Sequence, residues 1–224
     1  MLAEFWQDYG QLLAQGTGTT LYMTLASTLM AYILGIPMGI ILVVTAPGGL
    51  HPNAVIYKIM DFVVNIVRSI PFLILLIMIM PFTRLIVGKS YGSTATVVPL
   101  VVSAAPFIAR MVESSLLEVD HGVIEAAQSM GASNWMIISR VMLTEARTSL
   151  IVGATIALGT ILGYSAMAGT VGGGGLGDIA IRYGYYRYET GVMLITVVLL
   201  VLLVQIMQAI GMKISKKLDK RITG

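Results

Sequence analysis

Residues Thr190–Met212 read TGVMLITVVLLVLLVQIMQAIGM and contain no charged side chain. A helix needs about 20 mostly apolar residues to cross the hydrocarbon core of a bilayer. Its backbone groups must then be hydrogen-bonded within the helix, because lipid offers them no partners. The length and apolar character of this stretch predict a transmembrane helix.

The rest of the chain has the same character. Hydrophobic residues make up 57% and charged residues 11% of the sequence, whereas a soluble domain carries roughly 25% charged residues. The gaps between charges predict four further spans, at about residues 19–44, 59–83, 90–112 and 146–168. We therefore expect an all-α membrane protein with five transmembrane helices, which form a single domain over residues 1–224.

The basic residues predict how these spans are oriented. Cytoplasmic loops of membrane proteins are enriched in Lys and Arg. The segment after the fifth span is strongly basic, with Lys213, Lys216, Lys217, Lys220 and Arg221. This places the C-terminus in the cytoplasm. Five spans are an odd number, so the N-terminus lies outside, and residues 113–145 form a cytoplasmic loop.

The first half of that loop has the signals of a short helix. Asp120 can cap a helix that runs from Ile124 to Met130. Gly131 suits the left-handed residue at which such a helix ends. A bend is therefore expected at Gly131.

The second half of the loop predicts another short helix, Trp135–Leu143, with Ser133 as its cap. Helical spacing places four apolar residues on one side of it: Trp135, Ile138, Val141 and Met142. From spacing alone, the loop is either an amphipathic connector on the membrane surface or a docking element for another protein.

The loop resembles a known motif. Glu125-Ala126-Ala127, with Gly131 four residues on and then nine residues before Val141 and Leu143, resembles the EAA motif of bacterial ABC importer permeases. The resemblance implies that residues 120–135 form a coupling helix seated in a groove of a cytoplasmic ATPase. The residues that it places at this contact are Glu125, Ala126, Ala127, Gly131 and Ala132.

The sequence departs from the family at Thr144, where the family usually has proline directly after the leucine. Proline would break a helix at that point. Threonine puts in doubt the bend between the second short helix and the fourth span.

Longer strings narrow the resemblance. Asn65-Ile-Val-Arg-Ser-Ile-Pro-Phe72, Ala104-Ala-Pro-Phe-Ile-Ala-Arg-Met-Val-Glu113 and Gly163-Tyr-Ser-Ala-Met167 are similar to the permease subunit of methionine ABC importers, as are the glycine run and Tyr183-Gly-Tyr-Tyr186. This resemblance implies import of L- and D-methionine across the bacterial inner membrane by alternating access. It also implies two copies of an ABC ATPase and an extracytoplasmic substrate-binding protein as partners, with no nucleic acid.

Other functions remain open at this point. Five helices are few to enclose a gated path, so a homodimer is expected. A permease for another amino acid would share the EAA loop, and a secondary transporter would need no ATPase. An intramembrane enzyme would need a catalytic pair within the spans, and the sequence has no His, Cys or paired acids there.

Six residues are candidates for the translocation path: Arg68, Ser69, Pro106, Tyr164, Ser165 and Met167. A charge inside a span suggests function because it is costly there. Arg68 could equally extend toward the headgroups or pair with Asp61 on the same helix face. Ordinary helix packing is the alternative for Tyr164, Ser165 and Met167.

No resident cofactor or metal is expected. Zero cysteines and two histidines leave too few ligands for a metal site. Gly88-Lys89-Ser90 lacks the glycine five places earlier that a phosphate-binding loop needs. ATP and Mg²⁺ are therefore expected on the partner ATPase, and the chain itself is not an enzyme.

Two groups of glycines predict local structure. Gly35 and Gly39 stand four apart in the first span, which favours close packing between helices of the same chain. The run at residues 172–177 is expected to form a flexible loop on the outer face.

Overall fold

The computed structural model describes residues 2–218, with side chains from Phe5 onward. These residues form helices and connecting turns without any β-strand, which confirms the all-α fold. Lys220 and Arg221, used above for orientation, lie outside the described residues.

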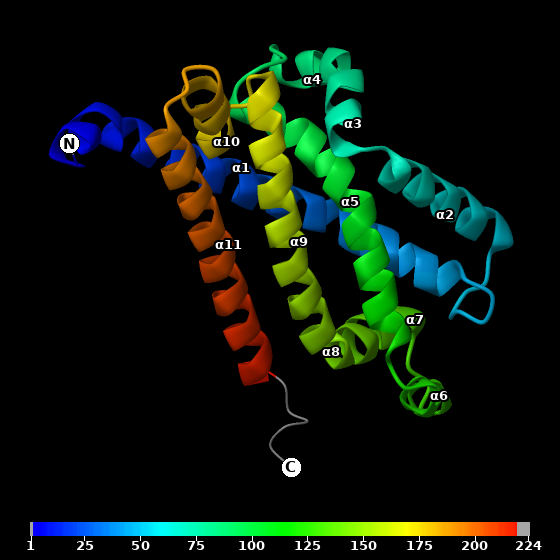
Figure 1. Cartoon of the computed structure of the whole chain (residues 1–224). Helices are drawn as coiled ribbons and strands as arrows, with labels where there is room; N and C mark the ends of the chain where they lie inside the picture. The colour runs from blue at the N-terminus through cyan, green and yellow to red at the C-terminus, as the bar shows by residue number, and fades with distance from the viewer. Residues whose placement is uncertain (1, 219–224) are drawn as a thin grey trace. The chain divides into compact units, whose positions relative to one another are not determined.

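The α-helices follow one another along the chain as shown in Figure 1. They are α1 (Leu2–Thr45), α2 (Ala54–Ser69), α3 (Phe72–Met78), α4 (Met80–Val87), α5 (Ser93–Leu117), α6 (His121–Ser129), α7 (Asn134–Met136), α8 (Leu143–Glu145), α9 (Arg147–Ala168), α10 (Gly175–Ile179) and α11 (Thr190–Leu218). Three tighter or wider helical turns join them, a 3₁₀ turn at Gly169–Val171 and π-helical segments at Ile137–Met142 and Ala180–Tyr185.

Four segments are long and apolar enough to cross a membrane: Phe5–Thr45, Ser93–Leu117, Arg147–Tyr185 and Thr190–Leu218. The bent pair of α2 and α3 makes a fifth if it is counted as one broken span. The break between them falls at Ile70 and Pro71, since proline has no N–H to donate and disfavours helical geometry in the residue before it.

The chain divides into two compact units. The first contains residues up to Met30, then Ile70–Ala104 and Leu158–Gln208. Its core includes Leu13 of α1, Leu176 and Ile179 of α10, and Val192 of α11.

The glycine run is a packed part of the first unit, so the expectation of a flexible loop was wrong. A Cβ at Gly177 would overlap the backbone of Ala166, and one at Gly173 would lie 2.7 Å from the carbonyl oxygen of Ala168. The backbone N–H of Leu176 donates to the Thr20 hydroxyl of α1 at 2.9 Å. These glycines let the α10 backbone lie directly against its neighbours.

The second unit contains Ala31–Ser69 and Ala105–Ala157 together with the residues from Ala209 onward. Gly35 faces Ile108, and Gly39 faces Val112 and the carbonyl oxygen of Ala109, where an added Cβ would come within 3.0 Å. This confirms the predicted packing within one chain. Leu42, Val64 and Ala109 form the buried cluster that joins α1, α2 and α5 there.

The helix axis changes direction at the junction of α8 and α9, although Thr144 replaces the family's proline (Figure 1). The turn falls at Ala146, which separates Glu145 from Arg147. Arg147 then donates from Nη2 to the carbonyl oxygen of Leu218 at 3.0 Å, which ties the start of α9 to the end of α11.

Candidate functional site: the α6–α7 loop

The α6 helix begins and ends as its sequence predicts. The Asp120 carboxylate accepts from the backbone N–H of Gly122 at 2.7 Å and so caps the first turn. At the other end, Gly131 has a φ of 79°. Its N–H donates to the carbonyl of Gln128 at 2.9 Å, and that of Ala132 donates to Ala127 at 3.0 Å. This pair of bonds satisfies the carbonyls of Ala127 and Gln128 near the end of α6 and fixes the bend.

The second short helix differs from the prediction in one respect. Ser133 caps it as expected, by accepting from the N–H of Met136 at 3.3 Å. From Ile137 onward the backbone is π-helical, however, and the wider turn shifts the following side chains around the axis. Ile138 and Met142 are buried, whereas Trp135 is 74% exposed. The prediction that Trp135 shares their face was wrong.

Together, α6 and α7 leave an uncovered surface formed by Glu125, Ala126, Met130 and Trp135, which we call the α6–α7 surface. Met130 is 81% exposed and Trp135 74% exposed. Glu125 and Ala126 are also exposed, and Glu125 Oε1 lies 3.0 Å from Nδ1 of His121 one turn earlier. This surface combines one carboxylate with two large apolar side chains, which is a composition suited to a protein contact.

Ala127 does not belong to this surface, because it is buried within the chain at 5% exposure. Ala132 is half-buried. Met130, directly before the glycine of the bend, was not among the predicted contact residues, and its exposure adds it as a candidate.

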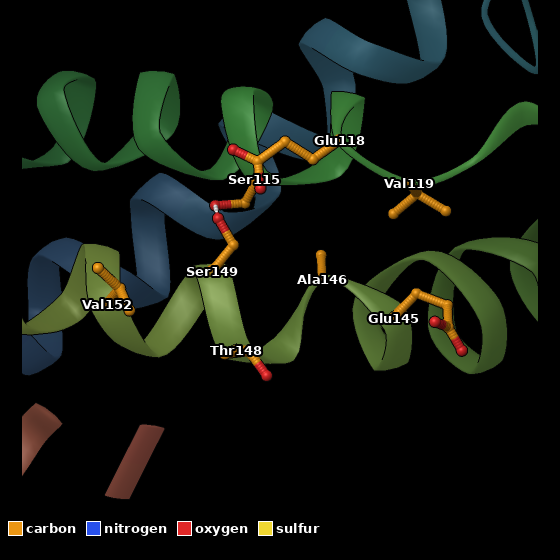
Figure 2. Close-up of a pocket in the computed structure, with 8 residues that line it drawn as sticks. All are labelled: Ser115, Glu118, Val119, Glu145, Ala146, Thr148, Ser149 and Val152. Atoms are coloured by element: carbon orange, nitrogen blue, oxygen red, sulfur yellow. Dashed lines mark hydrogen bonds between the residues drawn. The ribbon is translucent and has the colours of Figure 1, made fainter. Parts of the chain in front are cut away.

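A pocket of about 280 Å³ lies at the base of the loop, where α5 ends and α9 begins (Figure 2). Glu118 and Glu145 line it together with Thr148 and the Ser115–Ser149 pair. The two serine hydroxyls are hydrogen-bonded at 2.9 Å, which joins α5 to α9. The two helices that flank the loop are therefore hydrogen-bonded to each other where the loop begins and ends.

A second pocket of about 230 Å³ lies behind α6. Ile124 and Gln128 of α6 line it on one side, and Leu116 and residues 46–50 on the other.

Three of the path candidates lie in the second unit. Arg68 is exposed, and Asp61, one of the partners considered for it, pairs with Arg110 of α5 instead. The Ser69 hydroxyl donates to the carbonyl of Asn65 at 2.7 Å. Pro106 is buried inside α5.

The other three candidates lie in the first unit, on α9. Tyr164 stacks on Phe72 of α3, with ring centroids 4.6 Å apart and planes within 4°. Ser165 is buried and donates to the carbonyl of Leu162 at 2.7 Å, so its hydroxyl is satisfied within its own helix. Met167 is 51% exposed. The three side chains thus have three different surroundings.

A family model described as binding-protein-dependent transport system inner membrane component matches residues 31–222. The chain belongs to this family. The match includes all of the α6–α7 loop and both pockets beside it.

Named relatives of this permease cover most of its length. The probable D-methionine transport system permease protein of Vibrio cholerae is 49% identical over 220 residues, which cover 98% of each chain. The D-methionine transport system permease protein of Escherichia coli K12 is 51% identical over 158 residues, covering 70% of this chain and 73% of that protein.

Solved structures agree with the family assignment. The permease is similar to a chain in an inward-facing conformation of the MetNI methionine ABC transporter, with a TM-score of 0.94 and 48% identity over 95% of this chain and 99% of that one. An amino acid ABC transporter crystallised with histidines matches with a TM-score of 0.73, covering 96% of this chain and 95% of that one. At 19% identity, this match shows a shared fold alone.

Proposed function

We propose that the chain is the transmembrane subunit of an ATP-driven importer that carries methionine, as both the L and the D form, into the cytoplasm. The observation that carries this proposal is the similarity to the MetNI chain at 48% identity over 95% of the sequence. The names of the V. cholerae and E. coli relatives support the same substrate.

The assembly that we propose follows from this assignment. Two copies of the chain form the membrane part, two ABC ATPase subunits bind its cytoplasmic face, and an extracytoplasmic binding protein delivers methionine. ATP and Mg²⁺ bind to the ATPase subunits, and the permease catalyses no reaction itself. The complex lies in the bacterial inner membrane with the N-terminus outside and the C-terminus, including Lys213, Lys216 and Lys217, in the cytoplasm.

The α6–α7 loop is the proposed contact with the ATPase. Glu125, Ala126, Met130 and Trp135 present a mixed acidic and apolar surface, and Gly131 sets the angle between the two helices. Movement of the closing ATPase subunits passes through this loop and its base near Ser115 and Ser149 to α5 and α9. Inward-facing and outward-facing states are then linked to ATP binding by a coupling free energy between two distant sites.

A cross-linking experiment tests the contact. The chain has no cysteine, so Ala126→Cys provides a single thiol on the exposed side of α6. We expect it to form a cross-link to the copurified ATPase with a short reagent that carries one thiol-reactive end and one photoactivatable end. Ala127→Cys is the matched control, because this neighbour is 5% exposed and is expected to react slowly. If neither variant forms a cross-link to the ATPase in the intact complex, the docking role is contradicted.

A competition experiment tests the substrate. Uptake of labelled L-methionine by reconstituted complex and binding protein should be blocked by unlabelled D- or L-methionine, and little affected by histidine or glutamine. Stronger competition by a polar amino acid would assign the permease to a different cargo while leaving its place in the family unchanged.

A further inference from the structure

Asp61 and Arg110 join two helices that are far apart in the sequence. Nη2 of Arg110, on α5, donates to Oδ1 of Asp61, on α2. Nη1 of the same guanidinium donates to Oε2 of Glu113 one turn along α5, at 2.6 Å. Asp61 also accepts from the side-chain amide of Asn65 at 3.2 Å. Arg110 therefore bridges two carboxylates, one on each helix.

Apolar packing supplies the rest of the contact between α2 and its unit. Val64 is the buried residue of α2, at 0% exposure, and it packs with Leu42 and Ala109. Tyr57 and Met60 add partly buried contacts to the same cluster. The opposite side of α2 is apolar and exposed, with Phe62 at 65% and Ile59 at 61%. This apolar cluster and the ion pair between Asp61 and Arg110 together hold α2 against α1 and α5.

The charges at this contact are partly withdrawn from water. The side chains of Arg110, Asp61 and Glu113 retain 20%, 34% and 11% of their exposure. A planar guanidinium can donate to both carboxylates at once, which a lysine ammonium cannot do with the same geometry. Without Arg110, the two carboxylates would face each other, and their repulsion would push α2 away from α5.

We propose that Arg110 is a positioning residue for transport: it clamps α2 to α5 in the conformation described here, and the clamp opens and closes during each transport cycle. The inference rests on the proposed function. Asp61 is a third exposed, so its ion pair with Arg110 can exchange protein contacts for water at little cost.

A disulfide tests whether the contact opens. Val64→Cys with Ala109→Cys places two thiols in the buried cluster of a chain that has no other cysteine. Oxidation of the resting complex should lock α2 onto α5 and lower methionine uptake at least tenfold, and reduction should restore it. Each single-cysteine variant, treated identically, is the control.

Two outcomes would count against the proposal. Full uptake by the oxidised, cross-linked double variant means that α2 remains docked throughout the cycle. Failure of the pair to cross-link in the resting complex contradicts the docked arrangement itself. If the unmodified complex carries no methionine, the proposed function fails, and the clamp is then tested by ATP hydrolysis alone.

Substitution of the charges separates positioning from folding. Asp61→Asn keeps the size of the side chain and removes its charge, and we expect about three- to tenfold less methionine imported per ATP hydrolysed. Arg110→Lys should fall between this variant and the unmodified protein. Asp61→Arg combined with Arg110→Asp should recover part of the loss, because it rebuilds a cross-helix pair. A parallel fall of uptake and hydrolysis, with an unchanged ratio and no rescue by the exchange, would show a structural role only.

Discussion

Exchange of Gly177 for leucine is expected to leave almost no folded permease in the membrane. A Cβ at this position would overlap the carbonyl oxygen and two further backbone atoms of Ala166. Backbone atoms cannot rotate away as a side chain can, so α10 must separate from α9. We expect destabilisation of at least about 3 kcal/mol, the upper part of the range for overpacked cores. The fraction of monodisperse protein after a temperature series in detergent measures it.

Gly18→Ala is the matched control, because a Cβ at Gly18 meets nothing within 4 Å and this glycine lies inside α1. Alanine is favoured over glycine in a helix by roughly 0.5–1 kcal/mol, so this variant should be at least as stable as the unmodified chain. A Gly177→Leu protein with unchanged thermal stability would mean that α10 is not packed on the α9 backbone.

Gly131→Leu is expected to insert normally and to lose coupled transport. The position has open space around it, with nothing within 4 Å of an added Cβ, so the cost arises from its φ of 79°. A residue with a Cβ pays about 1–2 kcal/mol for left-handed geometry. Because about 1.4 kcal/mol corresponds to a factor of ten, we expect roughly tenfold less methionine imported per ATP hydrolysed in reconstituted vesicles.

Gly131→Asn separates the effect of backbone geometry from the effect of size. Asparagine adopts the left-handed region more readily than leucine, so this variant should retain most of the coupling. Equal loss in both variants would point to a direct steric conflict with the ATPase. Normal coupling in Gly131→Leu would remove the bend from the mechanism.

The sequence predicted those parts of the loop that depend on near neighbours in the chain. The Asp120 and Ser133 caps and the left-handed Gly131 each involve residues within five positions of one another, so residue type and spacing were sufficient. The long membrane-crossing helices were also predictable, because a span is recognised from the length and apolar composition of one continuous stretch of sequence.

Features that depend on distant residues could not be predicted in the same way. Helical spacing offered Arg68 as one partner for Asp61, but Asp61 pairs with Arg110, 49 positions away. Trp135 was placed on the same side as Ile138 and Met142 because a regular helix was assumed, and the π-helical segment after it changes the register. The glycine run looked flexible because nothing local indicates which backbone lies against it, whereas Gly177 packs on Ala166.

The central claim is that movement through the membrane is driven by an ATPase that acts on the α6–α7 loop. Transport in vesicles that contain the purified permease, with and without the ABC ATPase subunit, tests it most directly. The binding protein is supplied outside the vesicles, and ATP is supplied inside them, where the ATPase lies. Methionine should then accumulate inside the vesicles against its gradient, and without the ATPase it should not accumulate. Accumulation at the same rate in vesicles that contain the permease alone, driven by an ion gradient, would contradict the account.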